Sequence, residues 1–157
     1  MSLSRRHLLL SATSIAALSI ASACAPETAA PQTRSWRLPD PQPFTVTEHE
    51  WIPMPDGVRL SARIWRPDSA TTEPTPAVLE YLPYRKRDTY RPYDDITGKM
   101  LASRGIAYLR VDIRGTGDSE GVITDEYSEP ELADGVAVID WIAQQDWCNG
   151  AVGMRGI

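Results

Sequence analysis

The sequence predicts an α/β fold in which an antiparallel hairpin leads into a mostly parallel sheet with flanking helices. Two segments that alternate between apolar and polar residues lie on either side of an Asp-Gly turn, which is typical of a hairpin. Two later segments, residues 77–82 and 106–113, are mostly apolar, as expected for strands covered on both faces. Helix signals lie between and after them. The predicted order is a hairpin followed by β-α-β-α-β, which requires a mixed sheet with right-handed crossovers.

The hairpin is predicted from residues 44–51, FTVTEHEW, and residues 58–65, VRLSARIW, with Asp56-Gly57 in the turn. Alternation in the second segment places one set of side chains on one face, namely Val58, Leu60, Ala62 and Ile64. The opposite face carries Arg59, Ser61 and Arg63. We therefore expect an antiparallel pair with one face in water.

Two helices are predicted on the faces of the sheet. The first runs from Ile96 to Arg104 and is closed by Gly105. The second begins at a capping box formed by Ser128 and Glu131, with Pro130 in its first turn. Its apolar residues at helical spacing predict the buried stripe, which consists of Leu132, Val136, Ile139 and Ala143.

The end of the chain, WCNGAVGMRGI, predicts a turn at Asn149-Gly150, a buried strand over residues 151–154 and a new turn at Arg155-Gly156. A strand leading into Gly-x is the first half of the motif G-x-S-x-G, in which a serine nucleophile stands on a sharp turn between a strand and a helix. In this interpretation the residue after Ile157 is the nucleophile.

The amino-terminal segment predicts export. Residues 1–23 have a basic head with Arg5-Arg6, an apolar run and small residues before Cys24, as in a secretory signal peptide. The paired arginines favour the twin-arginine route, and a mitochondrial presequence is the alternative. Cys24 is a candidate lipid anchor, which would make the chain an envelope lipoprotein. Residues 24–43, rich in Pro, Ala and Thr, predict a flexible linker to a domain over residues 44–157.

Composition and charge exclude some classes of function. The formal net charge of −5 gives no support for a nucleic-acid partner, and the short run Arg85-Lys86-Arg87 is interpreted as a solvated loop. Two cysteines provide no disulfide framework, and Cys148 is interpreted as a small half-buried hydrophobic residue. We expect no cofactor and no metal, and the sequence does not predict the oligomeric state.

The segment VDIRGTGDSEG, residues 111–121, allows three interpretations. A phosphate-binding loop would use Gly115-x-Gly117, but the third glycine and the helix are missing. A protease-like patch around Ser119 has Glu120 where chymotrypsin-type enzymes have glycine. The favoured interpretation is structural. Asp112 would accept hydrogen bonds from loop amides, Arg114 would pair with carboxylates, and both glycines would take positive φ.

Tyr84 follows the strand of residues 77–82 at its carboxyl end, in the segment EYLPYRKRD. Its position alone leaves two possibilities open. The ring could pack on the core with its hydroxyl in water, or the hydroxyl could point into a crevice at the carboxyl edge of the sheet, where α/β proteins build their sites.

Taken together, these segments resemble the amino-terminal part of the cocaine esterase / Xaa-Pro dipeptidyl-peptidase (CocE/NonD) group of α/β-hydrolases. The resemblance rests on MPDGVRLSARIWRP, PAVLEYLPYRKRD, LASRGIAYLRVDIRGTGDSEG and DGVAVIDWIAQQDWCNGAVGMRGI, in the family's order and spacing. It implies a serine hydrolase with a Ser-His-Asp mechanism, acting on small-molecule ester, amide or peptide substrates. Tyr84 matches the family tyrosine whose hydroxyl contributes to the oxyanion hole, and is the one catalytic residue that can be assigned.

The resemblance also implies that this chain is an amino-terminal fragment, truncated before the nucleophile and inactive on its own. The acid and base of the family lie beyond Ile157, and His49 is interpreted as an exposed strand residue. The alternative is a catalytically inactive envelope lipoprotein or binding module with a truncated hydrolase fold.

Overall fold

The computed structural model describes residues 37–156, and its sheet begins with the predicted hairpin. Strand β1 (Phe44–Pro53) pairs antiparallel with strand β2 (Arg59–Pro67). The turn between them places Gly57 at φ +90°, in the left-handed region that favours glycine. Both strands extend two residues further than the sequence predicted at their carboxyl ends. A short 3-10 helix (Asp68–Thr71) then leads to the third strand.

Within the described residues the sheet has five strands, in the order β1-β2-β4-β3-β5. Strands β3 (Thr75–Leu82) and β4 (Ala107–Asp112) are parallel, and β5 (Cys148–Arg155) runs parallel to β3 on its other side. Strand β4 also pairs antiparallel with β2, which joins the hairpin to the parallel strands. The predicted α/β class and mixed sheet are confirmed.

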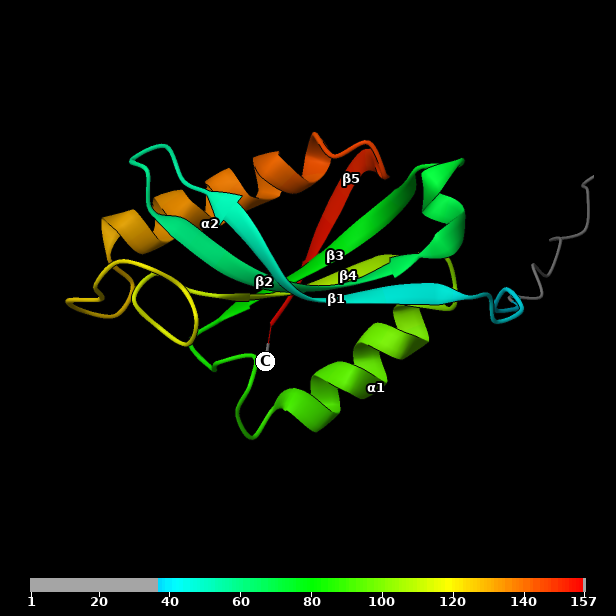
Figure 1. The fold of residues 1–157 in the computed structure, drawn as a ribbon, viewed down its shortest axis with the longest axis horizontal. Helices are drawn as coiled ribbons and strands as arrows, with labels where there is room; N and C mark the ends of the chain where they lie inside the picture. The colour runs from blue at the N-terminus through cyan, green and yellow to red at the C-terminus, as the bar shows by residue number, and fades with distance from the viewer. Residues whose placement is uncertain (1–36, 157) are drawn as a thin grey trace, which may run out of the picture. The chain divides into compact units, whose positions relative to one another are not determined.

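The two helices lie on opposite faces of this sheet (Figure 1). Helix α2 (Glu129–Ala143) covers the apolar face, where Val138 and Ile142 pack in the core. Helix α1 (Arg91–Ala102) covers the other face and packs beside Trp65. This second face of β2 was expected to be wet, but Ser61 and Arg63 are buried beneath α1 and the loop after β3.

Helix α1 begins at Arg91 and ends at Ala102, whereas the sequence predicted Ile96 to Arg104. Its first half is polar and aromatic, so it carries no apolar stripe, and Pro92 in its first turn was the start signal that the prediction did not use. Gly105 follows at φ +83°, as expected for a residue that closes a helix.

The predicted buried stripe and capping box of α2 are wrong in detail. The helix begins after Ser128 as expected, but Glu131 accepts the amide N–H of Tyr127, and the Ser128 side chain makes no capping hydrogen bond. Of the predicted stripe, Leu132 and Val136 are each 61% exposed, whereas Ile139 is partly buried and packs against the core. The buried face is instead made by Asp134, Gly135, Val138 and Ile142, and on this face Asp134 binds Arg114.

Strand β5 is longer and more exposed than predicted. It starts at Cys148, and most of its residues are exposed because it forms the edge of the described sheet. Asn149 and Gly150 lie within the strand at a register shift, not in a turn, and the Asn149 side chain accepts the amide N–H of Ala151.

The predicted signal peptide, Cys24 and most of the predicted linker lie outside the described residues. Within residues 37–156, no helix has both the length and the apolar character needed to cross a membrane.

Candidate active site at the carboxyl edge of the sheet

The three parallel strands end at one edge of the sheet, so the loops that follow them are neighbours. Strand β3 ends at Leu82, β4 at Asp112 and β5 at Arg155. Arg155 is in register with Glu80 of β3. Tyr84, two residues beyond Leu82, therefore lies at the same edge as the chain that leaves β5.

The Tyr84 ring stacks on Tyr90, with ring centroids 4.6 Å apart and an interplanar angle of 18°. The Tyr90 ring is in turn tilted against the ring of Tyr93, with ring centroids 6.1 Å apart. Tyr84 is 39% exposed and lines a hollow of about 280 Å³, together with Pro83, Arg85, Asp88, Thr89 and Tyr90. The ring thus packs on a neighbouring tyrosine, while part of the side chain stays accessible at the edge of the sheet.

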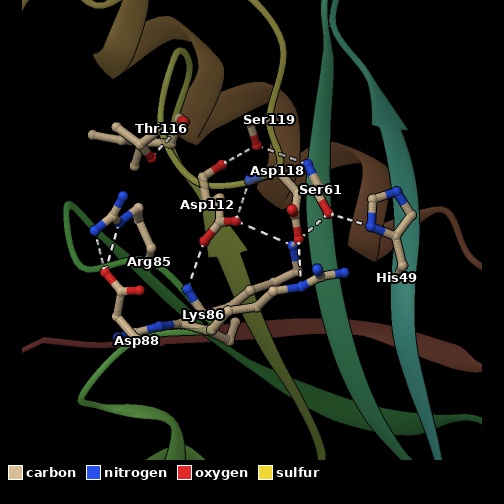
Figure 2. Close-up of polar contacts among 12 residues, drawn as sticks. His49, Ser61, Arg85, Lys86, Asp88, Asp112, Thr116, Asp118 and Ser119 are labelled. Carbon is tan, nitrogen blue, oxygen red and sulfur yellow. Dashed lines mark hydrogen bonds and ion pairs between the residues drawn. The ribbon is translucent and has the colours of Figure 1, made fainter.

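Lys86 does not lie in a solvated loop, contrary to the sequence-based interpretation. Its side chain is 1% exposed, whereas those of Arg85 and Arg87 are 58% and 62% exposed. Its ammonium Nζ lies 3.1 Å from Asp112 Oδ2 and 2.5 Å from Asp118 Oδ2. Figure 2 shows these contacts at the end of the Lys86 side chain. Of the three consecutive basic side chains, only that of Lys86 contacts buried acceptors, so only Lys86 points into the domain.

The loop after β4 is built around the Asp112 carboxylate, as the structural interpretation of VDIRGTGDSEG predicted. The amides of Lys86 and Asp118 donate to it over 2.7 and 2.9 Å (Figure 2). Gly115 and Gly117 have φ of 70° and 56°, in the left-handed region. The Asp118 amide of this glycine-rich loop therefore binds a protein carboxylate, as the structural interpretation expected.

Arg114 forms the predicted carboxylate pairs. Its guanidinium donates two hydrogen bonds of 2.7 Å to Asp134 of α2 and one of 2.7 Å to Asp56 of the hairpin turn. The hydrogen bonds with Asp134 and Asp56, together with their charges, raise the pKa of Arg114. The hydrogen bond from Arg114 lowers the pKa of the Asp56 carboxyl. Arg114 thereby joins the loop after β4 to helix α2 and to the β1–β2 hairpin turn.

The described serines and histidine near this edge are engaged in structural contacts. Ser119 Oγ donates to the Asp112 carbonyl and accepts the Ser61 amide, which leaves the protease-like interpretation without support (Figure 2). His49 was expected to be exposed but is half-buried, with its Nδ1 2.9 Å from Ser61 Oγ. Ser61 is fully buried, so substrate cannot reach its hydroxyl.

A buried charged cluster lies beneath the edge, on the α1 face. Arg110 pairs with Glu80 at 3.0 Å and with Asp94 of α1 at 3.3 Å, and the Tyr108 hydroxyl donates to Glu80. Burial, with a smaller contribution from the Glu80 charge, raises the pKa of Asp94 to about 6 despite the opposing effect of Arg110. Burial also raises the pKa of Tyr108.

Cys148 is a free thiol, 8% exposed, at the amino end of β5 and thus remote from the carboxyl edge. It is more deeply buried than the half-buried position predicted. Among the described residues, no group of three His, Cys, Asp or Glu side chains is placed to hold a metal ion.

The family model described as X-Pro dipeptidyl-peptidase (S15 family) matches residues 56–157. The chain belongs to the S15 family. Cocaine esterase of a Rhodococcus species is 35% identical over 115 residues, which cover 73% of this chain and 19% of that enzyme. The chain spans about a fifth of the length of the curated relatives it matches.

Solved structures support the fold of this S15 chain. A CocE/NonD family hydrolase from Staphylococcus aureus superimposes with a TM-score of 0.61 at 24% identity, covering 72% of this chain and 23% of the other. An α-amino acid ester hydrolase gives a TM-score of 0.52 at 24% identity, covering 85% and 24% of the two chains. The resemblance to CocE/NonD α/β-hydrolases is therefore confirmed, and the described residues form the first part of that fold.

Within this S15 framework, the sequence pointed to Tyr84 and Asp112 but missed Lys86, Tyr90 and Asp118. No pattern distinguishes Lys86 from the two arginines beside it. Tyr90 precedes a helix whose start was predicted too late, so its stacking on Tyr84 could not be foreseen.

Proposed function

We propose that the protein containing this chain is an exported serine hydrolase that cleaves ester or amide bonds of small-molecule or peptide substrates. The serine would follow Ile157, and its histidine and aspartate partners would lie further along the chain. Tyr84 would donate its hydroxyl to the substrate oxygen as that oxygen becomes negative in the transition state. Family membership and the names of relatives, an X-Pro dipeptidyl-peptidase and a cocaine esterase, support this substrate range.

One observation carries the proposal. The register of β3 and β5 brings Tyr84 and the chain leaving Arg155 to the same edge of the sheet. A nucleophile on a sharp turn after β5 would therefore lie at the same edge as the loop that holds the partly exposed Tyr84 side chain. An oxyanion donor has to lie close to the atom that the nucleophile attacks, and the shared edge of the sheet supports this role for Tyr84.

The test is covalent labelling of the full-length protein with a fluorophosphonate probe, followed by identification of the modified residue. We expect a single labelled serine at the position after Ile157. Labelling of no serine in the folded protein would reject the proposed mechanism and favour the inactive lipoprotein or binding module. We propose that residues 1–157 alone are inactive, because the described histidine contacts a buried serine and would be poorly placed as a base.

Export is a separate part of the proposal, supported by residues 1–24. We propose that residues 1–23 direct export by the twin-arginine route and that Cys24 carries a lipid anchor. Replacing Arg5-Arg6 by lysines should retain the protein inside the cell. Cys24→Ala should move exported protein from the membrane to the soluble fraction, and an unchanged distribution would reject the anchor.

A further inference from the structure

Lys86 is a buried cation two residues from the proposed oxyanion donor. Two residues of chain span about 7 Å at most, so fixing Lys86 strongly limits where Tyr84 can lie. The Lys86 side chain is 1% exposed, so bulk water does not solvate its ammonium group. Burial of a charge is unfavourable unless hydrogen bonds and opposite charges compensate for it.

The compensation comes from two other segments of the domain. Lys86 Nζ donates to Ser61 Oγ of β2 over 2.7 Å and to Asp118 Oδ2 over 2.5 Å, and it lies 3.1 Å from Asp112 Oδ2. These three acceptors match the three N–H donors of an ammonium. The ammonium thus joins the loop after β3 to the loop after β4.

The backbone reinforces this connection. The Lys86 amide donates to Asp112 Oδ1 over 2.7 Å, and the Asp118 amide donates to Asp112 Oδ2 over 2.9 Å. A single buried carboxylate therefore holds an amide from each loop. Because several directional bonds must be satisfied together, the loops have one favoured arrangement, whereas an apolar contact would permit sliding.

We propose that Lys86 is a positioning residue that holds the Tyr84 loop against the loop after β4, so that the Tyr84 hydroxyl is fixed for oxyanion stabilisation. The proposal rests on the proposed hydrolase function. Lys86 contributes through Tyr84 and does not contact substrate. Its loss should lower kcat while leaving KM nearly unchanged, since the oxyanion forms only in the transition state.

The test uses the full-length protein and a double-mutant cycle. We expect Lys86→Met to lower kcat by about 10- to 100-fold, with KM within about threefold of wild type. In a Tyr84→Phe background the same change should lower kcat by less than about threefold, because the donor that Lys86 positions is already gone. If the fold-losses of kcat in the two single mutants multiply in the double mutant, the proposal is overturned. An unchanged kcat in Lys86→Met would also overturn it.

Arg87→Gln is the matched control. Arg87 is adjacent and contacts Asp118 at 2.9 Å, but its side chain is 62% exposed. We expect kcat for this variant to stay within about twofold of wild type, because exposed ion pairs contribute little. A loss as large as that of Lys86→Met would assign the effect to the general charge of the loop and would also overturn the proposal.

Asp118→Asn provides a milder variant should Lys86→Met fail to fold, since Asp118 is 27% exposed. We expect faster amide hydrogen exchange in residues 83–90 and a kcat loss of about 3- to 10-fold that disappears in the Tyr84→Phe background. Unchanged exchange together with unchanged kcat would reject the connection. A folded wild-type protein with no hydrolysis and no probe labelling would instead reject the proposed function. Amide hydrogen exchange would still test whether Lys86 holds the loop after β3 against the loop after β4.

Discussion

Gly117 faces the Asp112 carboxylate so closely that a Cβ at position 117 would lie 2.1 Å from Asp112 Oδ2. Gly117 also has φ of 56°, which side chains rarely adopt. Glycine is required here for two independent reasons, the backbone conformation and the space that the carboxylate occupies. The loop after β4 can close around Asp112 only because this residue has no side chain.

Gly117→Ala should therefore be more damaging than a change that introduces backbone strain alone. Gly57 is the matched control, since it has φ of 90° and no atom would contact an added Cβ within 4 Å. In urea unfolding we expect Gly57→Ala to lower the free energy of unfolding by about 1 kcal/mol. Gly117→Ala should lower it by at least about 2 kcal/mol, because the Asp112 carboxylate must also move. Equal losses would show that the steric contact is unimportant.

Two helical glycines offer a second matched pair. A Cβ on Gly98 of α1 would lie 2.4 Å from the fully buried Trp65 ring, whereas a Cβ on Gly135 of α2 would meet Tyr81 at an ordinary 3.4 Å. Alanine favours a helix over glycine by about 1 kcal/mol. We expect Gly135→Ala to be neutral or stabilising, and Gly98→Ala to destabilise by about 1–3 kcal/mol as α1 is pushed from the sheet. Thermal or urea unfolding measures both, and stabilisation by Gly98→Ala would contradict the packing of α1.

Asp94 predicts a pH dependence of stability. Burial raises the pKa of its carboxyl to about 6, whereas in the unfolded chain the carboxyl would titrate near its ordinary pKa of 3.8. The folded state therefore holds a proton that the unfolded state has released, and stability from this group falls as pH rises from about 4 to 6. Burial is the largest cause of the raised pKa. Glu80 on β3 raises the pKa further, whereas Arg110 on β4, Arg63 on β2 and Arg155 on β5 lower it.

The measurement compares the free energy of unfolding of wild type with that of Asp94→Asn across pH 3–8. The hydrogen bond with Lys86 lowers the pKa of Asp118, so this group should make stability rise with pH. Because both proteins contain Asp118, the comparison cancels that trend. We expect wild type to gain up to about 2–3 kcal/mol relative to the variant as pH falls through 6 to 4, with a constant difference above pH 7. A difference that does not change with pH would mean that Asp94 titrates normally.

The fold class and the order of strands and helices along the chain could be predicted because they depend on patterns within short segments. The alternation in VRLSARIW and the Asp-Gly turn specify a hairpin whatever follows them. The exposed face of α2 could not be derived in the same way. Leu132 and Val136 have the spacing of a buried stripe, but the face that meets the sheet carries Val138, Ile142 and Asp134, whose partner Arg114 lies in a distant loop.

Prediction of the site from the sequence is limited in the same way, because burial of a side chain depends on residues that are distant in the sequence. Asp112 could be predicted as an acceptor for loop amides because it stands between a buried strand and a glycine-rich turn. The burial of Lys86 depends on acceptors from Ser61, Asp112 and Asp118, which lie 25 to 32 residues away in the sequence. A single sequence shows a basic run there, and only the fold brings these acceptors to its middle residue.

Tyr84→Phe removes one hydroxyl and keeps the ring that stacks on Tyr90. If this hydroxyl stabilises the oxyanion, kcat of the full-length protein should fall by about 100-fold or more, with KM within about threefold. Tyr127→Phe is the control, because Tyr127 is 80% exposed in the loop before α2 and should leave both constants unchanged. Steady-state kinetics with an activated ester and with a peptide substrate measure the effect for two leaving groups. An equal loss with both is expected, since the oxyanion forms on the acyl side in each case, and a kcat that stays at the wild-type value would remove Tyr84 from the mechanism.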